Sequence, residues 1–193
     1  MGLIIGFFAS YPPEFWIAQG ISVVTGILAI IMMQLKNMKA ILAFQITVNL
    51  IASTNYLLMD GDTGMIVSLV AVIHSVVMYF YNTKNVTPHV PVTVGFILVY
   101  LGCAAYNLIV THDPMEILPA LAAFCFAISL IQKKPSVFRI WGALNPTCWL
   151  AYDLYTSSYV MFLVHLGILI SSIVGMIRLD GYFRKKKPEG AEQ

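Results

Sequence analysis

The chain has 193 residues, of which 59% are hydrophobic and only 10% are charged. A soluble domain carries about 25% charged residues, so this chain has too few charges to cover a water-exposed surface. The composition therefore excludes a soluble enzyme, a nucleic-acid-binding protein, a disordered chain and a secreted disulfide scaffold.

Long stretches without Asp, Glu, Lys or Arg predict an all-α polytopic membrane protein with seven transmembrane helices. In chain order, the expected helix cores are residues 15–33, 40–59, 63–81, 91–111, 117–131, 140–155 and 158–177. Seven helices of about 20 residues leave little chain for loops, and no extramembrane domain fits.

The fifth and sixth expected helices look short because charged residues lie close to them. We expect the long side chain of Arg139 to reach the membrane surface, which would lengthen the sixth helix without burying its charge. At the other end of that helix we expect Asp153 to be a solvated carboxylate at the interface; the less favoured alternative is that it lines an outer vestibule. His165 lies nearer to an end of its helix, where a packing role is expected.

Basic and acidic residues separate when seven crossings are assumed. All 11 Lys and Arg residues follow the first, third, fifth or seventh helix, and therefore fall on one side of the membrane. Acidic residues of the loops fall on the other side: Glu14, Asp60, Asp62, Asp113, Glu116 and Asp153. Because loops rich in Lys and Arg face the cytoplasm, the N-terminus is expected outside and the C-terminus inside.

The second and sixth helices share a pattern. Asn49 and Tyr56 stand seven residues apart in one, and Asn145 and Tyr152 stand seven residues apart in the other. Seven residues make about two helical turns, so each pair shares a face of its helix. The match predicts an internal repeat of three helices.

Two such repeats would be joined by one linker helix. An odd linker makes both repeats cross the membrane in the same direction, which is a parallel repeat about an axis along the membrane normal. The expected segments are an N-terminal extracytoplasmic or interfacial segment (1–14), the first repeat (15–81), the linker (82–114), the second repeat (115–178) and a cytoplasmic basic tail (179–193).

This order of three, one and three helices resembles the SWEET sugar-transporter fold and its PQ-loop and PnuC vitamin-transporter relatives. A closer resemblance covers nearly the whole chain from Trp16. Residues 16–20, residues 116–119 and the pair Cys148 and Trp149 are similar to the bacterial inner-membrane YgjV family. The resemblance implies a location in the bacterial inner membrane and supplies no substrate. The PQ-loop dipeptide is absent, so a sugar or PQ-loop-type substrate lacks support.

Polar residues within the expected helices are candidate solute-binding groups, because buried polar groups in lipid are costly unless they are paired. Asn49 and Asn145 occupy equivalent positions and would face one cavity near the midplane; alternatively, they only hold helices together by hydrogen bonds. Further candidates add an amide, an imidazole and aromatic rings: Gln19, His74, Tyr56, Tyr152 and Trp149. Such groups suit a small neutral solute with hydroxyl or heterocyclic groups.

The sequence thus predicts a small-solute transporter with a central cavity between two helical triplets. Facilitated diffusion is favoured because no acidic residue lies in the middle of an expected helix, although His74 could carry a proton. The alternatives are a non-transporting membrane scaffold, subunit or sensor, and, less favoured, an enzyme at the outer face.

Expected partners are the lipid bilayer and a small neutral solute. No nucleic acid, cofactor or metal is expected, because the sequence contains no Walker loop and no HExxH or other metal-ligand spacing. No enzyme activity is expected from its motifs, and the homo-oligomeric state stays open.

Overall fold

The computed structural model describes residues 12–59, 62–155 and 159–180. In these residues the chain forms seven α-helices and one short 3-10 helix, with no β-strand, which confirms the all-α prediction. The elements are α2 (Pro13–Met33), α3 (Met38–Leu58), α4 (Asp62–Thr83), α5 (Val90–Thr111), η1 (Pro114–Glu116), α6 (Ile117–Ile131), α7 (Pro135–Tyr155) and α8 (Tyr159–Asp180).

Local sequence determines where several helices begin and end. Pro13 opens α2, a position at which the missing N–H of proline costs no helical hydrogen bond. The side chain of Asn37 caps α3 by accepting a hydrogen bond from the Lys39 N–H at 3.0 Å. At the end of α5, His112 adopts a left-handed conformation with φ of 53°, which stops the helix. Short connections of this kind make consecutive helices antiparallel neighbours.

Each of the seven expected helices corresponds to one observed helix. Among the described residues, α2, α3, α4, α5 and α8 are long and apolar enough to cross a membrane. The helix α6 has 15 residues and α7 has 21, but α7 carries several polar residues. The helix α6 packs against α5 and α7, and α7 packs against α6 and α8. A helix face that contacts other helices can carry polar residues that lipid would not accept.

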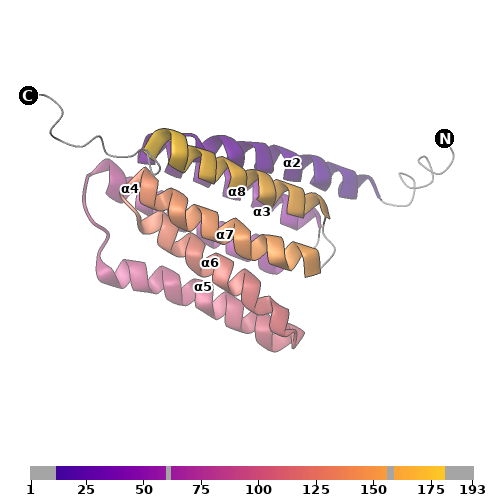
Figure 1. Cartoon of the computed structure of the whole chain (residues 1–193). Coiled ribbons are helices and arrows are strands. Elements are labelled where there is room, and N and C mark those ends of the chain that lie inside the picture. Colours follow the sequence, from indigo (N-terminus) through magenta and orange to yellow (C-terminus); the bar gives the residue numbers. More distant parts are fainter. Residues whose placement is uncertain (1–11, 60–61, 156–158, 181–193) are drawn as a thin grey trace, which may run out of the picture.

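The helices lie side by side in one bundle, and α2 begins at the end opposite to that at which α8 finishes (Figure 1). The helix α3 packs against α2 and α4, and α7 packs against α6 and α8. Contacts between α2 and α8 on one side, and between α4 and α6 on the other, close these six helices into a ring. The helix α5 lies against α6 and also touches α4.

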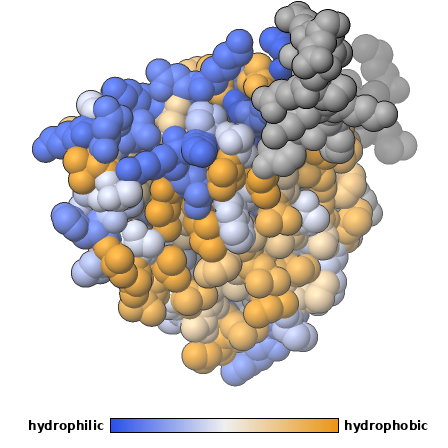
Figure 2. Space-filling model, turned by 60° about the vertical axis from the view of Figure 1, so that its left-hand side comes forward, coloured by the Kyte–Doolittle hydropathy of each residue, from blue (hydrophilic) through white to orange (hydrophobic). Residues whose placement is uncertain are grey.

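Basic residues lie together at one end of this bundle, where α2, α4, α6 and α8 end. The basic residues at this end, which we call the basic end, are Lys36, Lys39, Lys84, Lys133, Lys134 and Arg178. Figure 2 shows hydrophilic residues gathered over one part of the molecule and a broad hydrophobic surface beside them. Large apolar side chains such as Leu98, Ile109 and Leu163 are more than 60% exposed on the helix flanks, as a lipid-facing surface requires.

A buried apolar cluster fills the interior toward the basic end. We call it the basic-end cluster; it consists of Met32, Met33, Met38, Ile41, Leu42, Met78, Leu130 and Phe138. These residues come from α2, α3, α4, α6 and α7. The cluster therefore packs most of the bundle together at this end.

Arg139 lies beside this cluster and is only 1% exposed, so the expectation that its side chain reaches water is wrong. Its Nε donates a hydrogen bond to the Met33 carbonyl at 2.8 Å, and its Nη2 donates to the Leu35 carbonyl. Its Nη1 forms an ion pair with Asp180 Oδ1 at 2.7 Å. The last carbonyls of a helix lack intrahelical partners and carry partial negative charge, so the end of α2 stabilises a guanidinium inside the protein.

Small residues of α8 complete this contact between α2, α7 and α8. The Ser172 hydroxyl donates to the Arg139 carbonyl at 2.8 Å. A Cβ added at Gly175 would lie 2.7 Å from the Met33 carbonyl oxygen and 3.0 Å from Cδ and Nε of Arg139. Glycine is therefore required here by the close approach of α8 to α2 and α7.

We predict that Gly175→Ala lowers the stability of the protein by about 1–3 kcal/mol, because the added methyl group forces α8 away from a backbone carbonyl. Thermal unfolding in detergent measures the effect. Gly102→Ala on α5 is the matched control, since a Cβ there meets no atom within 4 Å. Equal unfolding temperatures for the two variants would contradict the close packing at Gly175.

Candidate functional site

A cavity of about 610 Å³ lies between the helices. Its walls come from all seven α-helices, and its volume falls in the range of sites that hold small molecules. It extends from Thr111 and Asp153, near one end of the bundle, to Met33 and Phe138 at the other. Because these last two residues belong to the basic-end cluster, apolar side chains close the cavity toward the basic end.

Amide side chains are the main polar groups on the cavity wall: Gln45, Asn49, Asn55, Asn107 and Asn145. Asn49 donates from Nδ2 to the Gln45 carbonyl at 2.9 Å, within α3. Asn145 donates from Nδ2 to the Ala122 carbonyl of α6 at 2.7 Å. Each amide thus donates one hydrogen bond to a protein carbonyl, and these bonds orient both side chains on the cavity wall.

Asn55 contributes a second kind of polar group to the wall. Its Nδ2 donates to the Ser22 hydroxyl of α2 at 3.0 Å. Its Oδ1 is buried and has no hydrogen-bond partner among the described residues. A buried carbonyl without a partner is unfavourable, so this oxygen is available to a donor that enters the cavity.

Pro146 adds a local feature beside Asn145. It lies inside α7 and is buried. Proline has no N–H, so the Gly142 carbonyl one turn earlier loses its helical donor. Gly142 is itself a cavity-lining residue, so the interruption of the helix lies beside the candidate site.

Aromatic side chains form the wall near the end opposite to the basic end. The Trp149 ring stacks on the His165 imidazole with centroids 5.6 Å apart and an angle of 11° between the planes. Tyr152 meets Trp149 edge to face at 5.9 Å. Tyr56 of α3 also lines the cavity. Such rings offer flat surfaces for a heterocycle or for the C–H faces of a sugar.

An acidic residue and a histidine also meet on this wall. Asp153 Oδ2 lies 2.6 Å from His165 Nδ1, with side-chain exposures of 5% and 13%. The expectation that Asp153 is a solvated carboxylate is wrong, because α8 packs His165 against it. The signal in the sequence was the short connection after α7, which makes the end of α7 and the start of α8 antiparallel neighbours.

The structure places most of the expected solute-binding residues together. Five of them line the cavity: Asn49, Tyr56, Asn145, Trp149 and Tyr152. Gln19 is partly buried on α2 and lies outside the cavity lining. His74 is fully buried on α4 and also lies outside it, stacked on Phe96 of α5 at 4.0 Å.

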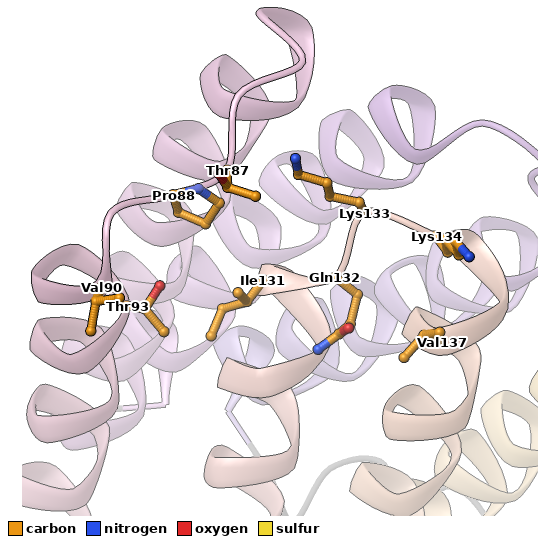
Figure 3. A pocket seen from close by; sticks show the side chains of 9 residues that line it. All are labelled: Thr87, Pro88, Val90, Thr93, Ile131, Gln132, Lys133, Lys134 and Val137. Atoms are coloured by element: carbon orange, nitrogen blue, oxygen red, sulfur yellow. The ribbon is translucent and has the colours of Figure 1, made fainter.

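A second hollow of about 410 Å³ lies at the basic end, between the start of α5 and the α6–α7 connection (Figure 3). Lys133 extends there toward Thr87 and Pro88, and both Lys133 and Lys134 are exposed. The Gln132 amide is turned back onto its own helix, where it donates to the Ile128 carbonyl at 2.9 Å. This surface hollow lacks the convergent polar groups of the central cavity, which is therefore the candidate site.

We predict that the central cavity contains water. In a background in which Cys103, Cys125 and Cys148 are replaced by Ala, Asn145→Cys should react at least about tenfold faster with a charged methanethiosulfonate than Leu144→Cys. The reactive species is the thiolate, which forms in water and not in hydrocarbon. Leu144 is the matched control, since it is 45% exposed on the flank of the same helix. Equal rates would mean that the cavity is closed to water.

Comparison with known protein families identifies the family of this chain. The model of the Imp-YgjV family, described as a bacterial inner membrane protein, matches residues 16–182. Comparison with curated proteins and with solved structures found no match. The match covers most of the chain and agrees with the apolar helices, so this integral membrane protein belongs to the Imp-YgjV family of bacterial inner membrane proteins.

Proposed function

We propose that the protein is a small-solute transporter whose solute occupies the central cavity. The observation that carries this proposal is a cavity of about 610 Å³ whose wall includes both Asn49 and Asn145. A scaffold or subunit would be better served by a sealed apolar core, because polar groups that face an interior space need partners. Water or a solute supplies those partners here.

Charge sets the proposed orientation. Lys and Arg residues at the basic end favour the cytoplasm, which puts the start of α2 outside and the end of α8 inside. In this orientation the basic-end cluster closes the cavity on the cytoplasmic side. The arrangement then corresponds to a transporter whose inner gate is shut.

Alternating access needs a seam that can open at the basic end. The proposed moving units are the triplets α2–α4 and α6–α8, which meet where α2 contacts α8 and where α4 contacts α6. A rotation by half a turn about the axis of the ring would bring the triplet α2–α4 onto the triplet α6–α8. The same rotation would bring the α2–α8 contact onto the α4–α6 contact, which supports a parallel repeat. Rocking of one triplet against the other would separate the basic-end cluster and expose Asn49 and Asn145 to the cytoplasm.

The wall also indicates the class of solute. Amides provide both donors and acceptors, and Trp149, Tyr56 and Tyr152 provide flat apolar surfaces. No Lys or Arg is among the described residues of the wall, so an anion would find no counter-charge. A neutral hydroxylated or heterocyclic solute, such as a sugar, a nucleoside or a vitamin, fits these groups best.

We predict that a thermal-shift screen of sugars, nucleosides and vitamins in detergent finds a stabilising solute. A ligand at 100 times its Kd stabilises the folded state by about 2.7 kcal/mol, which is readily measured. In proteoliposomes the same compound should enter in the presence of the parent protein. Asn49→Ala and Asn145→Ala should each reduce uptake at least about fivefold, since each removes a hydrogen bond of about 1 kcal/mol or more.

Thr47→Ala is the matched control for these variants, because Thr47 is exposed on the flank of α3 and only bonds the Ala43 carbonyl of its own helix. It should transport like the parent. Folding of every variant is checked by its unfolding temperature. Full uptake by folded Asn49→Ala and Asn145→Ala would show that these amides do not bind the solute. Failure of every compound to stabilise or cross would favour the scaffold or sensor function.

A further inference from the structure

We propose that the Asp153–His165 pair is a proton-binding site on the cavity wall, and that this proton is coupled to solute movement. The coupling rests on the transporter function proposed above, whereas the proton site does not. The expectation of facilitated diffusion relied on the absence of an acidic residue in the middle of a helix. Asp153 lies in the last turn of α7, but it lines the cavity and so adds a carboxylate to the candidate site.

The geometry assigns a role to each nitrogen of His165. Its Nδ1 lies 2.6 Å from Asp153 Oδ2, so in the neutral ring Nδ1 carries the proton and donates to the carboxylate. The Nε2 atom then holds the lone pair. Because His165 lines the cavity, Nε2 can take a proton from water there. The product is an imidazolium paired with a carboxylate.

Uptake of one proton changes the net charge of this pair from minus one to zero. Asp153 and His165 are the only groups on the described wall that carry charge near neutral pH. The other titratable groups of that wall are phenols and a thiol: Tyr56, Tyr100, Tyr152 and Cys103. Protonation of the pair therefore changes the total charge of the cavity wall.

Neighbouring elements add few charges near the pair. Tyr56 of α3 lies within electrostatic range of Asp153. Farther toward the same end, Asp113 interacts with Tyr155, which is exposed. Glu14 is the acidic residue in the first turn of α2. No Lys or Arg of the described residues lies at this end of the bundle.

Proton coupling follows from this change in charge. A net negative charge on an interior wall is unfavourable, and moving it through the closed state is more unfavourable still. The protonated pair is neutral overall and lets the wall close. A carrier with such a site would rearrange mainly when the pair is protonated, which links each solute movement to one proton.

Trp149 offers a direct test of the proton site. Protonated imidazole quenches indole fluorescence on contact, and Trp149 stacks on His165. In a Trp16→Phe, Trp141→Phe background Trp149 is the single tryptophan. Its emission should fall on acidification in a single transition, because the protonated imidazole is the quencher.

Variants identify the group that titrates. His165→Gln should abolish the transition, and Asp153→Asn should move its midpoint by about one pH unit or more, because it removes the charge next to the ring. His74→Gln is the matched control and should leave the transition unchanged, since His74 stacks on Phe96 away from Trp149. Each variant is used only if its unfolding temperature shows a folded protein. A transition that survives in His165→Gln, or the lack of any transition in the parent, overturns the proposal.

The coupling is tested with the sugar, nucleoside or vitamin that passes the thermal-shift screen. Proteoliposomes with an outside pH about one unit below the inside should accumulate it up to about tenfold, the limit set by one coupled proton. Accumulation should be lost in His165→Gln and kept in His74→Gln. Equilibrative uptake by the parent without accumulation would overturn the coupling and leave the transporter standing. A fluorescence transition without uptake of any compound would overturn the transporter function and the coupling with it.

Discussion

Arg139 makes the contact on which the packing of this bundle at its basic end depends. Its guanidinium is buried, and it bonds two carbonyls at the end of α2 while it pairs with Asp180 at the end of α8. A buried arginine is tolerated only where its donors are satisfied, and here one side chain joins the first, sixth and seventh helices of the described chain. The ring of helices is closed at its α2–α8 seam by this contact.

The same contact determines where the cavity ends. Met33 and Phe138, which line the cavity, belong to the apolar cluster that fills the interior at the basic end beside the Arg139 contact. Toward the opposite end the cavity is lined by amides and aromatic rings. The charged contact and the apolar cluster therefore hold the same end of the bundle together.

Periodicity and charge allowed the helices to be predicted well. The ends of α6 were predicted to the residue, because Ile117 and Ile131 bound an apolar run. The start of α7 was predicted at residue 140, whereas the helix begins at Pro135. The error arose because Arg139 was taken as a boundary. A charge marks a helix end only if it must face water, and this one is neutralised by groups that lie far away in the sequence.

Side-chain partners across helices were harder to predict than positions within one helix. Asn49 and Asn145 were placed on one cavity because a matching interval of seven residues fixes the face of each helix. His74 looked equally suitable on its own helix, but Phe96 and Tyr100 of α5 cover it. Whether His74 faces the cavity or α5 depends on how α4 is rotated about its own axis relative to α5. The periodicity of the α4 sequence does not give this rotation. The Asp153–His165 pair was missed for the same reason, since it requires knowledge of the packing of α7 on α8.

The hairpin of α7 and α8 carries a carboxylate contact at each end, and the two contacts differ in one chemical respect. At one end a guanidinium meets a carboxylate, Arg139 with Asp180. At the other end an imidazole meets a carboxylate, His165 with Asp153, and an imidazole exchanges protons near neutral pH whereas a guanidinium does not. Under the proton site proposed above, a change in pH near neutrality would therefore act on one end of this hairpin and not on the other. An asymmetric response of this kind can tilt a hairpin within a bundle, because only one of its two attachments is altered.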